Sequence, residues 1–289
     1  MEALLSMSFD NLSSHDQAKI RKGLRQVEGL LAQICLSSSG TSYLRSTIDS
    51  EKERSPRKPL AELVNDPAFR EFFKLQSGFE WNVALRLINT LDRLLCKSQD
   101  GHNDLLIIQT LDLIQGILML HPPSRTLFSR ELYMNHLLDL LEPINCPAIQ
   151  SATIITLVCA LIETPQNTRT FENLDGLLIC TSLFKSRETS RDVKLKLVEF
   201  LYFYLMPEVP PTTSASIKSR GLDLQKHNPC DSDDFLGNVE VDERETIRNQ
   251  TEVTRSTQEK QALLGQYLHS VEDLVADLRE SAPFGGALA

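Results

Sequence analysis

The sequence predicts an all-α fold made of stacked helical repeats. Apolar residues recur at helical spacings along most of the chain, and no segment of useful length alternates between apolar and polar residues as a half-buried strand would. In addition, three long apolar segments each stop at a proline, at Pro122, Pro165 and Pro207. These stops lie 43 and 42 residues apart, which indicates an internal repeat.

The composition fits a globular protein with polar segments, since 41% of the 289 residues are hydrophobic and 24% are charged. The net charge of −9 argues against a nucleic-acid-binding protein, because such proteins are usually basic. No apolar run reaches the roughly 18 residues of a membrane-spanning helix, so we expect no membrane insertion. Residues 1–9 lack the basic and apolar regions of a signal peptide, and we expect a cytoplasmic protein.

Changes in composition divide the chain into five segments. We predict an N-terminal helix in residues 1–36, a flexible loop in 37–58 and the helical-repeat core in 59–207. Residues 208–255 are polar and acidic and are predicted to be a disordered linker. Residues 256–283 are predicted to form a C-terminal amphipathic helix.

The N-terminal helix is expected to run from Asp16 to Leu36, with Ser13 and Ser14 as candidate N-caps. Its apolar stripe contains Ile20, Leu24, Val27, Leu31 and Ile34. Four basic residues crowd its early part, namely Lys19, Arg21, Lys22 and Arg25. These four form either an ordinary solvated face or a docking surface for an acidic partner.

The central block is predicted to be helix after helix, joined by short loops. One helix is expected over 67–76, because Asp66 is a good N-cap before a first-turn proline. The next is expected over 81–96. A third is expected to be capped by Asn103 and to end at Leu120.

The predicted repeat consists of a short helix, a middle helix and a long helix. Polar segments after two of the proline stops end at Phe128 and Phe171, which are again 43 residues apart. Middle helices are expected over 131–141 and 174–184, and long helices over 105–120, 147–163 and 191–206. A period near 42 lies in the range of armadillo and HEAT repeats, which stack into an α-solenoid. The alternative is an irregular helical bundle in which the proline spacing arose by chance.

The C-terminal helix over 256–283 follows a linker that contains the acidic run Asp231, Asp233 and Asp234. An amphipathic helix beyond such a linker needs a surface to cover its apolar face. We therefore expect it to dock on the core as a cap or to pair with a helix of a partner.

The sequence contains no recognisable catalytic or metal-binding motif. Phosphate-binding glycine loops, the HExxH pattern and the GxSxG elbow are absent. The six cysteines form no CxxC pair, and none is followed six residues later by the arginine that a thiol phosphatase needs. The histidines stand at no ligand spacing. We therefore predict no catalytic residue, no cofactor and no metal, and we expect the cysteines to be reduced core thiols.

Partner-binding residues are expected on the long helices, because these line the binding face in armadillo-type stacks. We predict four of them at the helix over 191–206: Arg187, Arg191, Lys194 and Tyr202. Arginine and tyrosine are favoured interface anchors, and an ordinary solvated face is the alternative. Ser55, which precedes Pro56 in the loop, is a possible phosphorylation site.

Five sequence blocks carry a family resemblance: Met1–Asp10, Phe69–Phe73, His121–Arg125, Leu195–Tyr204 and Glu280–Gly285. Together they resemble the fungal cell division control protein 14 family, a component of the septation initiation network (SIN). The resemblance covers nearly the whole chain apart from residues 40–58 and 210–250. This family is distinct from the dual-specificity phosphatase of the same name, whose Cys-to-Arg signature this sequence lacks.

The resemblance implies an armadillo-like fold without enzymatic activity. It also implies a complex with a sterile-20-like, germinal-centre-type serine/threonine kinase, which acts with other SIN proteins at the spindle pole body in septum formation and cytokinesis. A spindle-pole anchor without a direct effect on a kinase is the alternative function, and a cryptic hydrolase is a third. The residues leave open which surface binds the kinase, what binding does to it, and the oligomeric state.

Overall fold

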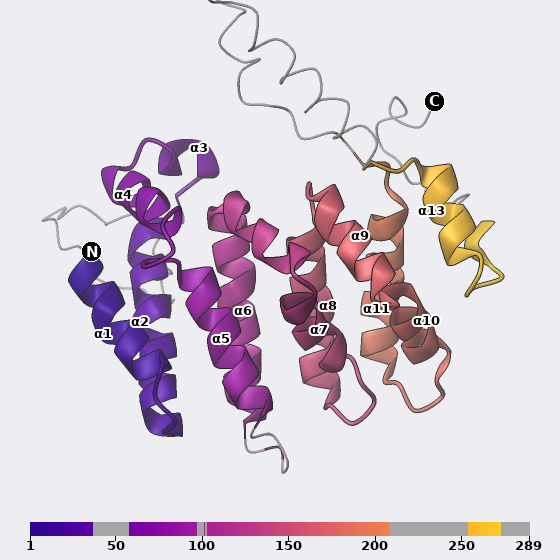
Figure 1. Cartoon of the computed structure of the whole chain (residues 1–289), viewed down its shortest axis with the longest axis horizontal. Helices are drawn as coiled ribbons and strands as arrows, with labels where there is room; N and C mark the ends of the chain where they lie inside the picture. The colour runs from indigo at the N-terminus through magenta and orange to yellow at the C-terminus, as the bar shows by residue number, and fades with distance from the viewer. Residues whose placement is uncertain (37–57, 97–100, 102, 209–253, 273–289) are drawn as a thin grey trace, which may run out of the picture. The chain divides into compact units, whose positions relative to one another are not determined.

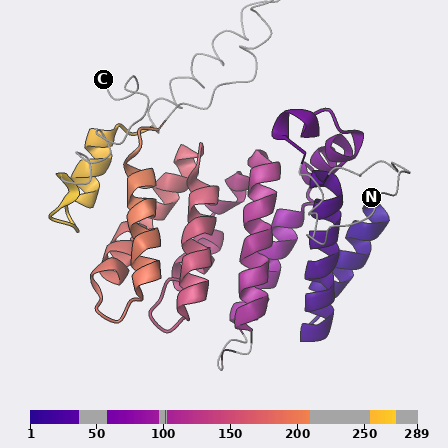
Figure 2. The same cartoon turned by 180° about the vertical axis from the view of Figure 1, so that it is seen from behind.

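The computed structural model describes residues 1–36, 58–96, 101, 103–208 and 254–272. Every regular element in these residues is a helix, and no β-strand occurs among them, as the sequence predicts. The chain divides into two compact units, Met1–Ala160 and Leu161–Ala289. Figures 1 and 2 show the helices of each unit from opposite sides.

The helices of the first unit are α1 (Glu2–Leu12), α2 (Gln17–Cys35), α3 (Leu60–Leu63), α4 (Pro67–Gln76), α5 (Val83–Leu95), α6 (Asp104–Leu120), the 3-10 helix η1 (Pro122–Ser129), α7 (Glu131–Asp139) and α8 (Pro147–Leu161), which ends one residue inside the second unit. Those of the second unit are α9 (Pro165–Asn173), α10 (Gly176–Lys185), α11 (Arg191–Leu205) and α13 (Thr257–Leu264).

The helix predicted from Asp16 to Leu36 is α2, and residues 2–12 form a further helix, α1, that was not predicted. α1 packs along α2 and buries Leu5, Phe9 and Leu12, which stand at helical spacing. The predicted N-caps of α2, Ser13 and Ser14, are wrong. The N-cap is Asp16, whose side chain accepts a hydrogen bond from the Ala18 amide. α1 was missed because its short stripe is interrupted by polar residues.

The helices of the central block agree closely with the predicted ones. α4 begins at Pro67, and Asp66 caps it by accepting bonds from the amides of Ala68 and Phe69. α6 ends at Leu120 as predicted, but Asn103 makes no capping bond. Its side chain instead donates a hydrogen bond to the Leu94 carbonyl and accepts one from the Gln17 side chain. Asn103 therefore joins α2, α5 and the start of α6.

The core of the first unit includes a buried histidine at the end of α6. The Nδ1 atom of His121 lies 2.8 Å from the hydroxyl of Ser124, and its Nε2 atom is buried without a hydrogen-bond partner among the described residues. The ring of Phe73 meets the imidazole edge-on, with ring centroids 4.5 Å apart. Burial therefore lowers the pKa of His121 from 6.5 to about 4, because protonation would place a charge in an apolar site.

In the second unit α10 packs against both α9 and α11. Phe171 of α9 and Phe200 of α11 are fully buried and meet edge-on, with ring centroids 5.6 Å apart. A Cβ atom at Gly176, the first residue of α10, would lie 2.3 Å from the ring of Phe171. The start of α10 therefore reaches this ring only because residue 176 has no side chain.

The predicted C-terminal helix ends earlier than expected. α13 stops at Leu264, and Gly265 forms its C-cap, so the continuous helix over 256–283 is wrong in its extent. Ser256 and Glu259 form a complete capping box at its start. Residues 273–283 of the predicted helix lie outside the described residues, as do Ser55 and most of the predicted loop and linker.

Two further expectations concern membranes and cysteines. Within the described ranges no single helix is long and apolar enough to span a membrane, although α6 and η1, bent by 120°, pass that test as a pair. The five cysteines in those ranges are free thiols. Only Cys180 is fully buried, and Cys96 is exposed, so the expectation of core thiols is wrong for most of them.

Replacing Gly176 with alanine is expected to lower the free energy of unfolding by about 1–3 kcal/mol, because the new methyl group overlaps the buried Phe171 ring. The control is Gly29→Ala on α2, where a Cβ meets nothing within 4 Å. That change is expected to stabilise the chain by about 0.5–1 kcal/mol. Urea unfolding followed by circular dichroism measures both, and equal effects would contradict the packing described for α10.

The stability of the chain is expected to fall as the pH is lowered from 6.5 to 4. Over this range the unfolded chain binds a proton at His121 before the folded chain does, so the contribution present above pH 6.5 is lost towards pH 4. The loss from this group is at most about 3 kcal/mol. Unfolding free energies measured across this range should show a flatter pH dependence for His121→Gln, and an identical dependence would argue against the buried neutral imidazole.

Candidate protein-binding surface

The four predicted binding residues lie on or just before α11. Ser190 caps this helix by accepting a hydrogen bond from the Val193 amide. Arg191, Lys194 and Tyr202 follow at offsets of three and eight residues, which places them on one face of the helix. Arg187 is exposed in the preceding loop. The structure therefore brings three of the four residues together, and their role in binding stays a prediction.

The same face of α11 also carries apolar side chains. Leu195 is 58% exposed and stands four residues after Arg191, and Met206 is 52% exposed just beyond the helix end. The opposite face is buried, as Val193, Leu197 and Phe200 show. The outward face thus combines two basic side chains with apolar surface, a composition typical of protein interfaces.

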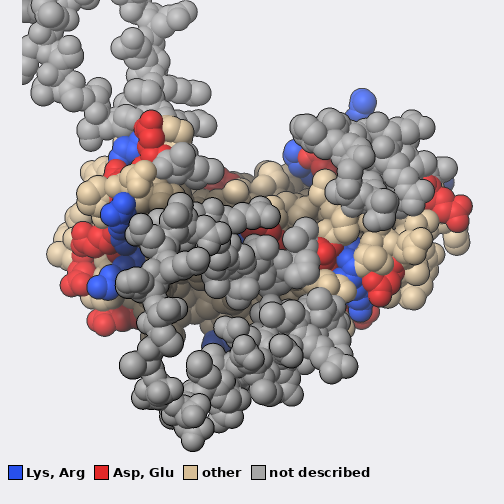
Figure 3. Space-filling view, turned by 90° about the horizontal axis from the view of Figure 1, so that it is seen from above, with Lys and Arg blue, Asp and Glu red and all other residues tan. Residues whose placement is uncertain are grey.

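Charges of both signs are spread over the described surface. In the space-filling view, the visible basic and acidic side chains lie next to one another (Figure 3). On α11 itself Lys196 pairs with Glu199 at 2.7 Å, on a neighbouring side of the helix. Charge alone therefore does not single out one site, and the combination with exposed apolar residues is more informative.

A half-buried polar cluster lies at the C-terminal end of α11. We use the name ion cluster for six residues: Arg169, Glu172, Tyr204, Glu208, Arg255 and Lys260. They come from α9, from α11 and the residues after it, from the segment that leads into α13, and from α13 itself, which contains Lys260. Three cations and two carboxylates leave one net positive charge.

Glu172 and Glu208 are the two centres of the ion cluster. Glu172 accepts a hydrogen bond of 2.7 Å from the Tyr204 hydroxyl and one of 2.5 Å from Arg255. Glu208 pairs with Arg169 at 2.5 Å and with Lys260 at 3.0 Å. Its other oxygen accepts from the backbone amide of Arg255. Segments that are 47 residues apart in the sequence are therefore joined directly.

Burial shifts two groups of the ion cluster. It raises the pKa of Tyr204, and the hydrogen bond to Glu172 and the charge of this carboxylate raise it further. Burial lowers the pKa of Lys260, and the nearby Glu208 carboxylate opposes this shift. The ammonium group also lies 5.2 Å from the centre of the Tyr204 ring. Lys260 thus contributes to the structure as a buried cation on the inner side of α13.

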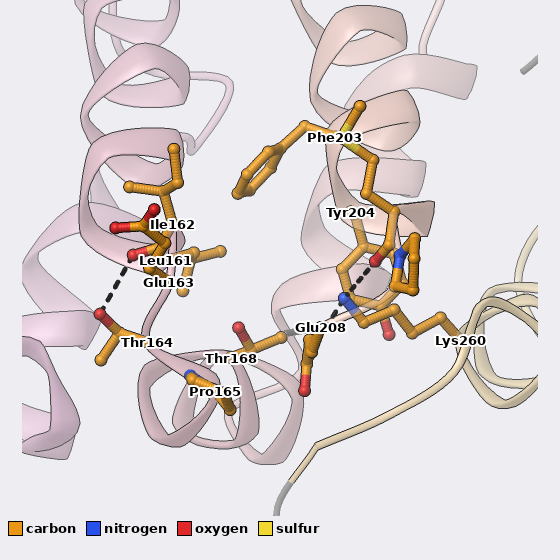
Figure 4. Close-up of a pocket in the computed structure, with 12 residues that line it drawn as sticks. Leu161, Ile162, Glu163, Thr164, Pro165, Thr168, Phe203, Tyr204, Glu208 and Lys260 are labelled. Carbon is orange, nitrogen blue, oxygen red and sulfur yellow. Dashed lines mark hydrogen bonds and ion pairs between the residues drawn. The ribbon is translucent and has the colours of Figure 1, made fainter. Parts of the chain in front are cut away.

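A pocket of about 200 Å³ adjoins the ion cluster (Figure 4). It is lined by the residues that end α8, by the start of α9, by the end of α11 and by Lys260. Ile162 and Phe203 lie on opposite sides of it (Figure 4). We call it the α11 pocket.

Sequence reasoning missed both the ion cluster and the α11 pocket. Lys260 offered a signal, because it stands four residues before Leu264 and therefore on the apolar stripe of the predicted helix. Arg169, Glu172 and Glu208 gave none, since charged residues at such positions are usually solvated.

The described residues offer little that could carry out chemistry. Among them no group of three or more His, Cys, Asp or Glu residues could hold a metal ion. Burial raises the pKa of the Cys180 thiol to about 12, which suppresses the thiolate that a nucleophile requires. The ion cluster holds together segments that are distant in the sequence.

Replacing Glu172 with glutamine is expected to lower the free energy of unfolding by about 2–3 kcal/mol, because Arg255 and Arg169 then lose a buried counter-charge. The matched control is Glu199→Gln, which breaks the exposed pair with Lys196 and should change stability by less than about 0.5 kcal/mol. Urea unfolding measures the stability of both variants. Trypsin cleavage near Arg255 measures how firmly the segment before α13 is held, and it should be faster in Glu172→Gln than in Glu199→Gln. Equal stability and equal cleavage in both variants would contradict the structural role of the ion cluster.

Comparison with known proteins places the chain in a family. A family model described as cell division control protein 14, SIN component, matches residues 1–284. Cell division control protein 14 of Schizosaccharomyces pombe is 28% identical over 293 residues, which cover 99% of this chain and 97% of that protein. No solved structure matches the chain. Because the family match extends over nearly the full sequence, the chain belongs to the family of the SIN component cell division control protein 14.

Proposed function

We propose that this chain is a non-catalytic, armadillo-like scaffold subunit that binds a sterile-20-like, germinal-centre-type serine/threonine kinase in the septation initiation network. In this role it promotes septum formation and cytokinesis at the spindle pole body. Membership of the SIN component family over residues 1–284 is the observation that carries the proposal. The other SIN proteins would be reached through the same complex.

The order and lengths of the helices support the repeat part of the proposal. η1, α7 and α8 contain 8, 9 and 15 residues, and α9, α10 and α11 contain 9, 10 and 15. α4, α5 and α6 follow the same short, middle and long order with 10, 13 and 17 residues. α4 also begins with a proline, so it is a candidate for the short helix of an earlier repeat.

Local conformation at equivalent positions supports the repeat as well. His121, just before η1, has φ −131° and ψ 79°, and Thr164, just before α9, has φ −133° and ψ 78°. These two residues are 43 positions apart in the sequence. Phe128 and Phe171, at the same spacing, are both fully buried. Because both residues precede a proline, their backbone angles are restricted in the same way, and it is the matching position of the two prolines and the two buried phenylalanines that favours a repeat.

The outward face of α11 supports the binding part of the proposal. Arg191 and Lys194 supply positive charge beside Tyr202 and the exposed Leu195. Basic and aromatic residues around apolar surface supply the anchors on which most interface energy depends. A kinase segment that binds here would therefore carry acidic residues beside apolar ones.

Co-expression of the full chain with the matching sterile-20-like kinase, followed by size-exclusion chromatography with mass determination, tests the proposal. We expect the two proteins to elute together at a defined stoichiometry. The double variant Arg191→Glu, Lys194→Glu is expected to weaken binding about 10- to 100-fold, because it reverses two interface charges. Kinase activity in the same fractions then shows whether binding activates or only retains the kinase.

The matched control is Lys19→Glu, Lys22→Glu, which reverses two exposed charges on α2. It is expected to leave binding unchanged. Loss of binding in this control alone would move the interface to α2. Separate elution of the unmodified proteins would overturn the kinase part of the proposal and favour a spindle-pole anchor.

A further inference from the structure

The loop between α10 and α11 carries a serine three residues after an arginine. Arg187 and Ser190 lie in residues 186–190, which join the two helices without regular structure. Of the arginines in the described ranges, Arg187 alone is followed at this offset by a serine or threonine. Basophilic protein kinases select an arginine at this offset, because acidic residues of their substrate groove pair with its guanidinium group. The loop therefore contains a sequence that such a kinase recognises.

The Ser190 side chain is accessible and weakly held. Residues 187–191 are all exposed or half-exposed. The Oγ atom of Ser190 accepts one long hydrogen bond, of 3.3 Å, from the Val193 amide, and no group among the described residues accepts its hydroxyl proton. The neighbouring Thr189 hydroxyl instead donates to the Leu183 carbonyl at 2.7 Å. Ser190 is thus the more available of the two hydroxyl groups.

The backbone of the loop already has the conformation that a kinase groove requires. Ser186 has φ −60° and ψ 137°, and Ser190 has φ −60° and ψ 153°, so both ends of the loop are extended. The Lys194 amide makes the first helical hydrogen bond of α11, to the Ser190 carbonyl at 3.1 Å. The amides before it make no such bond, and a first helical turn of this kind opens readily.

We propose that Ser190 is phosphorylated by a serine/threonine kinase that selects an arginine three residues before its target. The Oγ atom of Ser190 forms a bond to the γ-phosphorus of ATP, while the bond from this phosphorus to the β–γ bridging oxygen breaks and ADP leaves with its electron pair. A carboxylate of the kinase accepts the hydroxyl proton. The phosphate then lies at the N-terminus of α11, where the amides of the first turn and the adjacent Arg191 stabilise it.

A phosphate on Ser190 changes the charge of the outward face of α11. Arg191 follows Ser190 directly, and Lys194 stands four residues on, on the same side of the helix. Residues 187–194 carry three basic side chains and two acidic ones, Glu188 and Asp192, and their net charge is +1. The phosphate adds about two negative charges at pH 7, so the local charge changes sign. Phosphorylation therefore releases an acidic partner segment, and this consequence, unlike the modification itself, rests on the proposed function.

The first test is made on the full chain without its partner. The chain is incubated with Mg²⁺, ATP and a purified basophilic kinase, and peptide mapping by mass spectrometry is expected to find phosphate on Ser190. Arg187→Gln is expected to slow this transfer at least tenfold, because it removes the selected charge. The matched control Arg191→Gln removes the same charge from the other side of Ser190 and should not slow it. Absence of phosphate at Ser190, or equal rates in the natural chain and Arg187→Gln, would overturn the proposal.

The second test measures binding of the sterile-20-like kinase. Ser190→Asp and Ser190→Asn both keep a good N-cap, and only the first adds a charge. We expect binding to weaken about threefold in Ser190→Asp and about tenfold in the phosphorylated chain, and to stay within about twofold in Ser190→Asn. The phosphorylated chain is expected to melt about 2–4 °C higher, because the phosphate gains charge-assisted hydrogen bonds.

The remaining outcomes separate this proposal from the proposed function. Phosphate on Ser190 with unchanged binding would overturn the release, while the modification site stands. Equal loss of binding in Ser190→Asn and Ser190→Asp, or a lower melting temperature after phosphorylation, would show that the structure of the loop matters rather than its charge. A sterile-20-like kinase that does not bind the unmodified chain would instead overturn the proposed function, and the result of the first test would not depend on it.

Discussion

Burial of the apolar sides of the long helices is the constraint on which the rest of the structure depends. α6 buries seven of its residues, and α11 buries six. A helix of this kind gains its stability from tertiary packing rather than from intrinsic propensity. In the second unit α10 packs against the apolar side of α11, and the contact between Phe171 and Phe200 holds α9 against α11. The opposite side of α11 carries the exposed Arg191 and Leu195, where we propose that a partner binds.

The ion cluster completes this packing at the end of α11. Tyr204 is 1% exposed, and burying its hydroxyl without a hydrogen-bond partner would destabilise the fold. The Glu172 carboxylate accepts the hydrogen bond from this hydroxyl. The Glu172 carboxylate in turn needs counter-charges, which Arg169 and Arg255 supply. Because Arg255 leads directly into α13, satisfying one buried hydroxyl fixes the start of a segment that is distant in sequence.

Features written in local sequence could be predicted, and features that depend on tertiary contacts could not. The start of α4 was predictable because Asp66 and Pro67 form a local cap signal, and the order of short, middle and long helices was visible from proline spacing. α1 escaped prediction because its buried stripe spans only Leu5 to Leu12. The placement of Arg191, Lys194 and Tyr202 on one face follows from helical spacing, and their role in binding stays a prediction. The ion cluster depends on residues 83 positions apart, Glu172 and Arg255, which no sequence pattern connects.

The distribution of polar groups around the α11 pocket supports the proposed role in binding. A catalytic group needs a free proton position or lone pair directed at a substrate. In the α11 pocket Lys260 instead pairs with Glu208 and donates to the Met206 carbonyl, and the Tyr204 hydroxyl donates to Glu172. Most of the remaining wall is apolar, from Leu161, Ile162, Pro165, Phe203 and Met206. In the proposed function, such a surface would recognise shape and charge on another polypeptide.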